Sequence, residues 1–345
     1  MMRRALTLAE KGLYTTTPNP RVGCVVTKND TIVGEGWHER AGGPHAEVIA
    51  LELAGARAID STVYVSLEPC NHQGRTPPCV KKIIECKVKR VVAAMRDPNP
   101  KAAEGGTALA AAGIGFEHGL MESEARELNI GFVSRVTRGR PWVRLKVAAT
   151  LDGRTALADG RSQWITGAEA RRDGHRWRAR ACAILTGIGT VRADDPRLTV
   201  REVETPRQPL RVIVDSRMEA APGARIFQGE KVLIFSGTQG ARPNAEVVVL
   251  PNADRKVDLP RMLEELAKRG VNELHVEAGF RLNGSLVREG CVDEFLVYLN
   301  PSFLGDSAQG MLDLPAFESL EKKLTLKILS LERLGGDLRI LARPA

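Results

Sequence analysis

The sequence has 345 residues, of which 43% are hydrophobic and 27% charged, and this length predicts two domains rather than one. Its formal net charge is +8, but it has no run of five Lys or Arg residues and only 4% aromatic residues, so we expect anionic small-molecule substrates and no nucleic-acid partner. No apolar run approaches the roughly 18 residues of a membrane helix, and the basic start lacks a signal-peptide core of about 7 apolar residues, so we expect a cytoplasmic protein with no membrane partner.

Strands and helices alternate through the first 120 residues. Helix 2–13, for example, brings apolar residues to one face at helical spacing. Proline restricts the residue before it, so Thr17-Pro18-Asn19-Pro20 predicts an extended turn. We expect strands at 22–26, 31–33, 61–66, 89–94 and 114–117, and helices at 2–13, 45–54, 79–86, 104–112 and 121–128. This order predicts an α/β layered domain. Gly139 and Pro141 then mark the boundary, which predicts domains 1–139 and 140–345.

One imidazole and two thiols stand in a spacing that suits zinc. They are His45 in Pro44-His45-Ala46-Glu47, Cys70 after Pro69, and Cys79 after Pro77-Pro78. Three such ligands leave the fourth tetrahedral position open, as in catalytic zinc sites. Glu47 then matches the Glu of zinc deaminases, which moves protons and is not a ligand. Eight residues separate the two cysteines instead of two, so this is a loop-expanded variant.

The predicted helices bear on this chemistry. His45 and Cys79 fall at helix starts, where the helix dipole favours a thiolate. Residues two apart do not share a helix face, so His45 and Glu47 converge only if His45 lies in the first turn or just before it. His72 in the loop is open as a fourth ligand, although a supporting or substrate role is favoured. Cys24 and Cys86 fall in apolar elements and are expected to pack in the core.

The first half resembles the bifunctional riboflavin-biosynthesis deaminase-reductase family. The resemblance rests on Thr17–Gly23, Gly34–His38, Pro44–Val48, Leu67–Cys70, Gly74–Cys79 and Met95–Pro100. It implies a cytidine-deaminase-like three-layer fold, zinc on His45, Cys70 and Cys79, and Glu47 as proton shuttle. It also implies substrate contacts from Asn19, His38 and Arg75, and the charged fork of Arg75 suits phosphate. The implied reaction is hydrolytic deamination of 2,5-diamino-6-(5-phosphoribosylamino)pyrimidin-4(3H)-one.

The second half also has an α/β pattern. Strands are expected at 142–148, 183–186, 210–215, 231–236, 245–250, 273–277, 294–299 and 337–341, with helices near 169–179, 259–268 and 283–288. No Rossmann fingerprint is present, because Arg192 stands where the third glycine after Gly187 and Gly189 would be. The run Val276–Ser285 passes from a strand through glycines into a helix, whose free N–H groups can hold phosphate. The pattern alone leaves phosphate binding there open.

The resemblance extends through this half, which is similar in fold to dihydrofolate reductase. It rests on Lys146–Arg154, Ser162–Thr166, Gly187–Arg201, Asp215-Ser216 and Val276–Ser285. It implies that NADPH reduces the ring-opened ribosyl group, giving 5-amino-6-(5-phosphoribitylamino)uracil. The implied NADPH contacts are Ala148, Trp164, Thr190, Asp194, Ser216, Gly279, Phe280, Arg281, Leu282, Asn283, Gly284 and Ser285. The implied substrate contacts are Ser162, Arg178, Leu198, Arg201 and Glu277, with Arg178 and Arg201 suited to clamp a phosphate.

Two positions depart from the family pattern. Thr150 replaces a Ser but keeps the hydroxyl, so we expect little effect. Ala278 replaces a Gly, and an Ala at positive φ would be strained. The phosphate-binding loop is therefore expected to survive only if Ala278 has ordinary φ.

Three hypotheses remain open at this point. The first is the bifunctional deaminase-reductase, with one Zn²⁺ per chain, NADPH and a phosphoribosylated pyrimidine substrate. The second is a deaminase of a free or nucleic-acid base whose second half only binds. The third is a non-catalytic binding module held together by zinc. The family resemblance favours the first and also implies a homo-oligomer.

Overall fold

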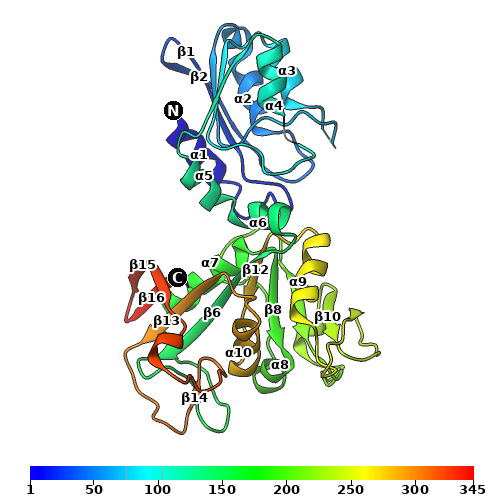
Figure 1. The fold of residues 1–345 in the computed structure, drawn as a ribbon, viewed down its shortest axis with the longest axis vertical. Helices are drawn as coiled ribbons and strands as arrows, with labels where there is room; N and C mark the ends of the chain where they lie inside the picture. The colour runs from blue at the N-terminus through cyan, green and yellow to red at the C-terminus, as the bar shows by residue number, and fades with distance from the viewer. Residues whose placement is uncertain (75, 103) are drawn as a thin grey trace. The chain divides into compact units, whose positions relative to one another are not determined.

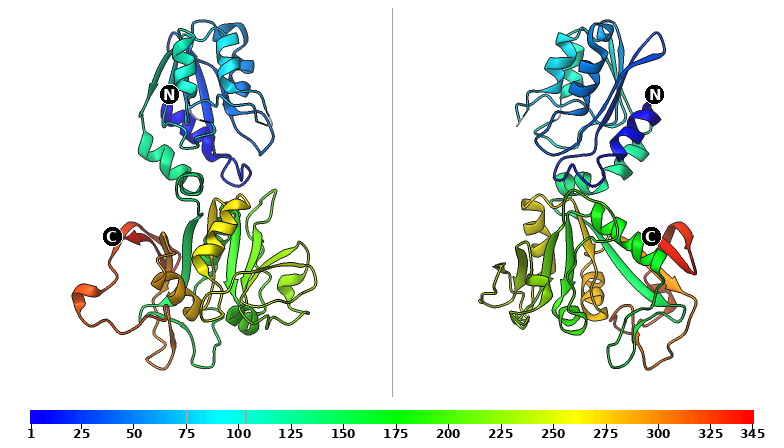
Figure 2. Two further views of the ribbon diagram at one scale, coloured as in Figure 1. Left: turned by 45° about the vertical axis from the view of Figure 1, so that its right-hand side comes forward. Right: turned by 180° about the vertical axis from the view of Figure 1, so that it is seen from behind.

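The computed structural model describes residues 1–74, 76–102 and 104–345, and the chain folds into two compact units, Met1–Gly139 and Arg140–Ala345. Figure 1 follows the chain from its N-terminus in blue to its C-terminus in red, and Figure 2 gives two further views. Each unit has its own sheet and its own core of buried apolar side chains.

The first unit is built on a five-stranded mixed sheet of order β2-β1-β3-β4-β5. β1 pairs antiparallel with β2 and β3, whereas β3, β4 and β5 run parallel. The strands are β1 (Gly23–Lys28), β2 (Thr31–Trp37), β3 (Thr62–Val65), β4 (Arg90–Ala93) and β5 (Gly115–His118). The helices are α1 (Met2–Glu10), α2 (Ala46–Ala54), α3 (Cys79–Glu85), α4 (Gly105–Ala111), α5 (Glu122–Leu128) and α6 (Ile130–Arg138), with a 3-10 turn at Gly55–Ala58.

Helices cover both faces of this sheet, and three glycines let them approach closely. A Cβ on Gly23 would lie 2.0 Å from Ala5 O in α1. On the opposite face, Cβ atoms on Gly34 and Gly36 would lie 2.1 Å from Ala50 O and 2.5 Å from Ala46 O in α2. Side chains at these strand positions would push the helices away from the sheet. The glycines therefore allow the helix backbones of α1 and α2 to pack directly on the strands.

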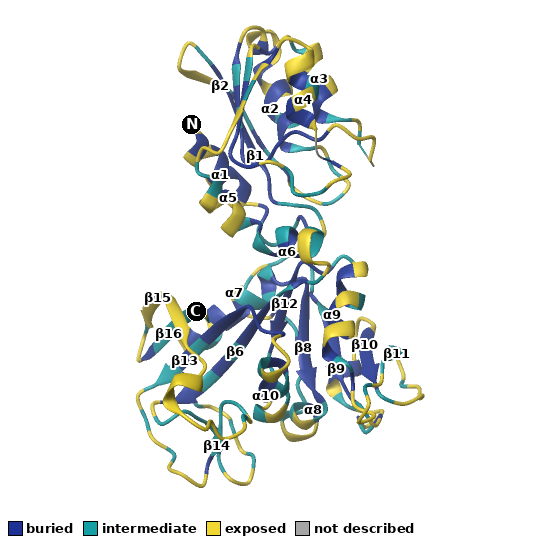
Figure 3. Ribbon diagram, in the orientation of Figure 1, coloured by how far each residue is buried: buried dark blue, intermediate teal, exposed yellow. Residues whose placement is uncertain are grey.

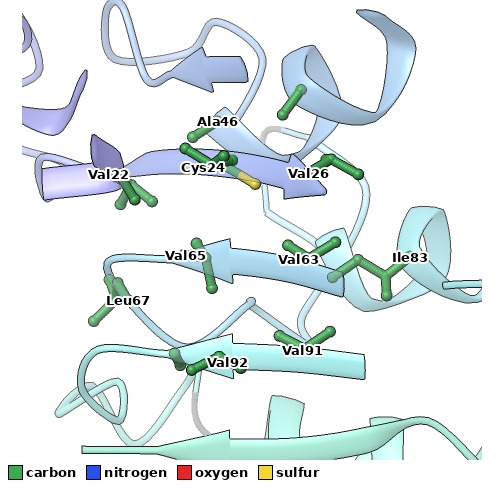
Figure 4. Packing of buried hydrophobic residues seen from close by; sticks show 14 of the residues in the cluster. Val22, Cys24, Val26, Ala46, Val63, Val65, Leu67, Ile83, Val91 and Val92 are labelled. Carbon is green, nitrogen blue, oxygen red and sulfur yellow. The ribbon is translucent and has the colours of Figure 1, made fainter. Parts of the chain in front are cut away.

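The core of the first unit lies within these layers. Figure 4 shows Cys24, Val26, Val63 and Val91 from the strands in one cluster with Ile83 of α3. Cys24 is fully buried and Cys86 is partly buried against the same cluster, as expected for packing thiols. The observed layers confirm the predicted α/β architecture of this half.

The second unit contains a nine-stranded sheet of order β11-β10-β9-β8-β12-β6-β13-β16-β15. The strands from β11 to β13 are parallel to their neighbours, and β16 and β15 close one edge antiparallel. The strands are β6 (Trp142–Thr150), β8 (Ala183–Gly187), β9 (Leu210–Val214), β10 (Val232–Ser236), β11 (Ala245–Val249), β12 (Glu273–Val276), β13 (Glu294–Asn300), β15 (Leu326–Leu334) and β16 (Asp337–Pro344). β7 (Arg154–Ala156) and β14 (Gln309–Gly310) form a separate two-stranded ribbon.

Four helices accompany this sheet: α7 (Ala168–Arg180), α8 (Ile188–Asp194), α9 (Leu259–Lys268) and α10 (Phe280–Arg288). Short 3-10 turns lie at Arg225–Phe227 and Leu320–Lys322. The interior strand β8 is wholly buried, as parallel strands covered on both faces are, whereas β15 is largely exposed (Figure 3). Along the described part of the chain, no helix is both long and apolar enough to cross a bilayer.

The structure departs from the predicted elements at several places. The first helix ends at Glu10 rather than residue 13, and α10 starts at Phe280 rather than Asn283. The α-helices and strands that the sequence analysis did not predict are α6, α8, β7, β14 and β15, and the three 3-10 turns were not predicted either. β15 was missed because its side chains alternate little between buried and exposed, since it is an edge strand with one neighbour.

Gly34→Ala is expected to destabilise the first unit. The added methyl group would overlap the Ala50 carbonyl oxygen, and overpacking of this kind costs about 1–3 kcal/mol. Hydrogen exchange measures the effect: amides of β1, β2 and α2 should exchange faster, while amides of β8 and β12 in the second unit keep wild-type rates.

Gly115→Ala is the matched control on edge strand β5. The nearest atom to its added Cβ is 3.7 Å away, which is ordinary van der Waals contact. It should leave exchange in the first unit unchanged. Equal protection in both variants would show that the close approach of α2 does not limit the stability of this unit.

Candidate functional site

His45 and Glu47 come together at the start of α2. His45 is the N-cap residue, with extended backbone angles of φ −78° and ψ 160°, and Glu47 lies in the first turn. Because His45 precedes the helix proper, the helical spacing that would separate residues two apart does not apply to it. The condition set by the sequence analysis is therefore met.

The two cysteines reach the same place from other elements. Cys70 follows β3 in a loop, and Cys79 is the first residue of α3 after Pro78. His45 Nδ1 lies 3.1 Å from Cys79 Sγ and 3.6 Å from Cys70 Sγ. The three candidate ligand atoms all lie within 4.8 Å of one another.

This geometry fits zinc. Tetrahedral ligands with Zn–N and Zn–S bonds of about 2.0 and 2.3 Å have N and S atoms about 3.6 Å apart. The His45 Nε2 atom, on the far side of the ring, lies 3.3 Å from the Thr76 hydroxyl, which fixes the ring with Nδ1 toward the thiols. Among the described residues, these three form the one cluster with metal-binding spacing, and His72 is exposed outside it.

Electrostatics favours an anionic sulfur in this cluster. A hydrogen bond with Cys79 and a second with His45 lower the pKa of Cys70 to about 4. The same pairing with Cys70, together with burial, raises the pKa of Cys79. Glu47 is 3% exposed, and burial raises the pKa of its carboxyl group although nearby His45 opposes the shift. A buried carboxyl beside a metal-binding cluster suits proton transfer.

Asn19 and His38 lie beside this cluster. His38 Nδ1 lies 2.9 Å from Pro44 O, so it carries the proton, and Nε2 accepts from Asn19 Nδ2 at 3.0 Å. The rings of His38 and His45 are 5.3 Å apart in a T-shaped arrangement. Arg75, the third predicted substrate contact, lies outside the described residues.

Two acidic residues near the cluster were not among the predicted site residues. Buried Glu68 accepts hydrogen bonds from Asp97 N at 3.1 Å and Gly106 N at 2.8 Å, which ties the Cys70 segment to the loop after β4 and to the start of α4. Burial raises the pKa of Asp97 to about 6. Glu68 lies in the motif Leu67–Cys70 and Asp97 in Met95–Pro100, and these family motifs were the sequence signal for both residues.

The second unit has a cavity of about 700 Å³ that is lined from β6, α7, α8, α10, β13 and the connecting loops, including the one that follows β12. Predicted site residues that line it are Ala148, Ser162, Trp164, Arg178, Thr190, Asp194, Leu198, Arg201, Glu277 and Asn283. Predicted cofactor residues that do not line it are Ser216, Gly279, Phe280, Arg281, Leu282, Gly284 and Ser285. Ser216 instead accepts a hydrogen bond from Val257 N at 3.1 Å.

A partly buried ion pair, Arg178–Glu277, lies in the cavity wall. Arg178 donates to both carboxylate oxygens of Glu277, at 2.5 and 2.8 Å, and to Thr199 O at 3.0 Å. The charge of Arg178 keeps the pKa of Glu277 well below its usual range in spite of burial. Arg178 is therefore paired with Glu277, whereas Arg201 forms no ion pair among the described residues and donates to Thr199 Oγ1 at 3.2 Å.

Lys146 and His175 also line the cavity, and the sequence analysis gave neither a role. Burial lowers the pKa of Lys146, and its Nζ lies 5.8 Å from the Tyr298 ring. Burial and nearby Arg178 lower the pKa of His175 to about 4, so its neutral Nδ1 accepts from Arg201 N at 3.2 Å. Lys146 stands in the quoted Lys146–Arg154 motif, which was the available signal.

The start of α10 fits a cofactor phosphate. Ala278 has ordinary φ, and the N-cap Gly279 has no side chain to shield the free N–H groups of Phe280 and its successors. A Cβ on Gly279 would lie 3.7 Å from Thr190 Oγ1, so α8 flanks this helix start. Asn283 Oδ1 is buried without a hydrogen-bond partner, an acceptor position that a bound ligand can satisfy.

Comparisons with known proteins agree across the chain. The family model "RibD C-terminal domain" matches residues 141–340, and "Cytidine and deoxycytidylate deaminase zinc-binding region" matches residues 1–95. The riboflavin biosynthesis protein RibD of Escherichia coli (strain K12) is 47% identical over 353 residues, 97% of this chain and 96% of that protein. RibD of Haemophilus influenzae is 44% identical over 99% of this chain and 96% of that protein.

Solved structures give the same result. Form 1 of Acinetobacter baumannii RibD superimposes with a TM-score of 0.93 at 41% identity, covering 100% of this chain and 98% of that one. A diaminohydroxyphosphoribosylaminopyrimidine deaminase/5-amino-6-(5-phosphoribosylamino)uracil reductase from Thermotoga maritima gives a TM-score of 0.91 at 34% identity, covering 100% and 97%. The chain therefore belongs to the RibD family of riboflavin biosynthesis proteins, in which a deaminase domain and a reductase domain share one polypeptide.

Proposed function

We propose that residues 1–139 deaminate 2,5-diamino-6-(5-phosphoribosylamino)pyrimidin-4(3H)-one and that residues 140–345 use NADPH to reduce the product to 5-amino-6-(5-phosphoribitylamino)uracil. The observation that carries the proposal is the convergence of His45, Cys70 and Cys79 beside the buried carboxyl of Glu47. The second hypothesis, a deaminase whose second half only binds, does not explain why Lys146 and the Arg178–Glu277 ion pair line one cavity.

In the first domain, His45, Cys70 and Cys79 hold the metal. When bound, zinc lowers the pKa of water toward about 7 and so makes it a nucleophile at neutral pH. Glu47 takes a proton from the attacking water and gives it to the departing amino nitrogen, so ammonia leaves and a ring carbonyl remains. Asn19 and His38, joined by a hydrogen bond, hold the substrate ring over these groups.

In the second domain, the start of α10 and Thr190 hold the cofactor phosphates. When bound, NADPH supplies the hydride. The hydride adds to the open-chain sugar carbon, and the electron pair of that carbon's double bond moves to the attached heteroatom. Lys146 gives this heteroatom a proton. Arg201 holds the substrate phosphate, and Arg178 keeps the Glu277 carboxylate ionised and fixed at the cavity wall.

We also propose that the chain works in the cytoplasm as a homo-oligomer. All six cysteines are free, which suits a reducing compartment. β15 is an edge strand that exposes Leu326, Ile328, Leu329 and Leu331 by 36%, 57%, 41% and 57%. An exposed apolar edge strand is a template for pairing with another chain, so a second copy is proposed to dock on β15.

Glu47→Gln separates the two activities and tests the proposed function. Wild-type enzyme with zinc, substrate and NADPH should release one ammonia for each NADPH oxidised. The variant should deaminate about 10² to 10⁴-fold more slowly, because the amide cannot carry the proton. Ammonia assay and NADPH absorbance measure the two steps.

The controls for Glu47→Gln are zinc content and the second reaction. The variant should keep one zinc per chain and should oxidise NADPH at the wild-type rate when given the deaminated intermediate. No NADPH oxidation by the wild-type chain would eliminate the reductase proposal, and wild-type deamination by the variant would exclude Glu47 as the shuttle.

Lys146→Met is expected to lower the reductase kcat about 10²-fold or more, because the proton donor is removed. In the wild type, the donor must be protonated, so the rate is full below the lowered pKa of Lys146 and declines as pH rises through it. Lys146→Arg keeps its charge at all working pH values, so its small remaining rate should show no such decline. Rates measured across pH with the deaminated intermediate check this.

Lys268→Met on the exposed face of α9 is the matched control and should behave as wild type. A wild-type kcat for Lys146→Met would rule out the proposed proton donor. A high-pH decline that persists unchanged in Lys146→Arg would assign the titration to another group.

Ile328→Asp combined with Leu331→Asp is expected to break the proposed contact between copies. A copy that docks on β15 would have to bury the two new aspartate charges, and burying unpaired charges is costly. Sedimentation equilibrium should give at least a dimer for the wild type and a monomer for the double variant. Leu53→Asp, at a 63% exposed leucine on α2, should leave the wild-type mass unchanged. A monomeric wild type, or an unchanged mass for the double variant, would refute the contact.

A further inference from the structure

The loop that carries Asn19 is held by the α5–α6 junction. Asn129 is both the C-cap of α5 and the N-cap of α6, and it is 1% exposed. Its Oδ1 accepts from Arg21 N at 2.8 Å, and its Nδ2 donates to Arg21 O at 2.9 Å. One side chain therefore pairs with both backbone groups of Arg21, two residues after Asn19.

This use of Asn129 is unusual for its position. An asparagine at an N-cap ordinarily accepts from a backbone N–H in the first turn of its own helix. Here the side chain makes no such capping bond. Its hydrogen-bonding capacity goes instead to a loop more than a hundred residues earlier in the sequence. Asn129 therefore does not cap α6 with its side chain, and it holds the loop that carries Asn19 instead.

Two arginines complete the attachment on either side of Asn19. Arg21, 6% exposed, donates from Nη1 to Leu128 O at 2.6 Å, at the C-terminal end of α5, and from Nη2 to Leu13 O at 3.4 Å. Arg135 of α6 donates from Nη2 to Pro18 O at 3.3 Å. Pro18 and Arg21 flank Asn19, so the backbone is anchored before and after it.

We propose that Asn129, assisted by Arg21 and Arg135, is a positioning residue for the deaminase reaction, which it serves by fixing Asn19 against His38 and the zinc ligands. This inference rests on the proposed function of the first domain. Asn19 Nδ2 reaches His38 Nε2 at 3.0 Å, and the His38 ring lies 5.3 Å from that of His45. A loop displaced by about 1 Å would move the Asn19 amide out of hydrogen-bond reach of a substrate held at the metal.

Asn129→Leu tests the proposal, because it removes both hydrogen bonds at similar volume. The deaminase KM should rise about tenfold, as expected when buried hydrogen bonds are lost, with kcat changed less than threefold. Zinc content should stay at one per chain. The reductase rate, measured in the same sample with the deaminated intermediate, should match wild type and so reports the amount of active enzyme.

A double-variant cycle separates positioning from a merely structural role. Asn19→Ala alone should raise KM, and adding Asn129→Leu to it should raise KM no further, because the group that Asn129 positions is gone. Additive losses, or a KM for Asn129→Leu within twofold of wild type, would overturn the proposal. Arg126→Met, which breaks only the exposed Arg126–Glu122 pair on α5, is the matched control and should keep wild-type KM.

A milder variant covers the case in which Asn129→Leu loses zinc. Arg135→Met removes the hydrogen bond to Pro18 O and the guanidinium contact with the Phe132 ring from a half-exposed side chain, and it should raise KM about threefold with zinc retained. An unchanged KM in that variant would overturn the proposal. A wild-type chain that releases no ammonia would instead refute the proposed function, and the inference with it.

Discussion

The zinc site depends on the direct contact between α2 and β2. Gly34 and Gly36 have no side chains between the helix backbone and the strand, where a Cβ would lie 2.1 Å from Ala50 O and 2.5 Å from Ala46 O. This contact sets the distance between α2 and the sheet, and that distance determines the position of the first turn of α2. His45 is the N-cap of α2 and Glu47 lies in its first turn, so the metal ligand and the proton carrier are both held by the start of one helix.

The first site was predictable because its chemistry is local. His45, Glu47, Cys70 and Cys79 lie within 35 residues, and each is placed by a helix start or a proline that the sequence displays. One imidazole and two thiols at such spacing are typical of a zinc site. The strands and helices around it were predicted for the same reason: their apolar periodicity is strong, because both faces of this sheet are covered.

The second site was less predictable because tertiary pairing decides the role of each charge. Arg178 lies in a basic run on α7, and nothing in the sequence indicates that Glu277, just after the distant strand β12, accepts its hydrogen bonds at 2.5 and 2.8 Å. Residues such as Ser162 and Leu198 could be proposed only through family resemblance. β15 was missed since an exposed edge strand has no alternating burial to detect.

The charged residues around the cavity of the second domain distinguish Lys146 from Arg144, its neighbour on β6. Along the same face of β6, Arg144 is paired with Glu294 at 2.5 Å and Glu273 at 3.1 Å, so its charge is balanced. Lys146 is the next residue on that face. Burial and the like charge of Arg178 lower its pKa, and the charge of Glu277 only partly opposes this shift. Because Glu277 already forms two hydrogen bonds with Arg178, its charge is shared. The ammonium group of Lys146 at the cavity therefore holds its proton less tightly than an exposed lysine does, and this suits the proposed role of proton donor.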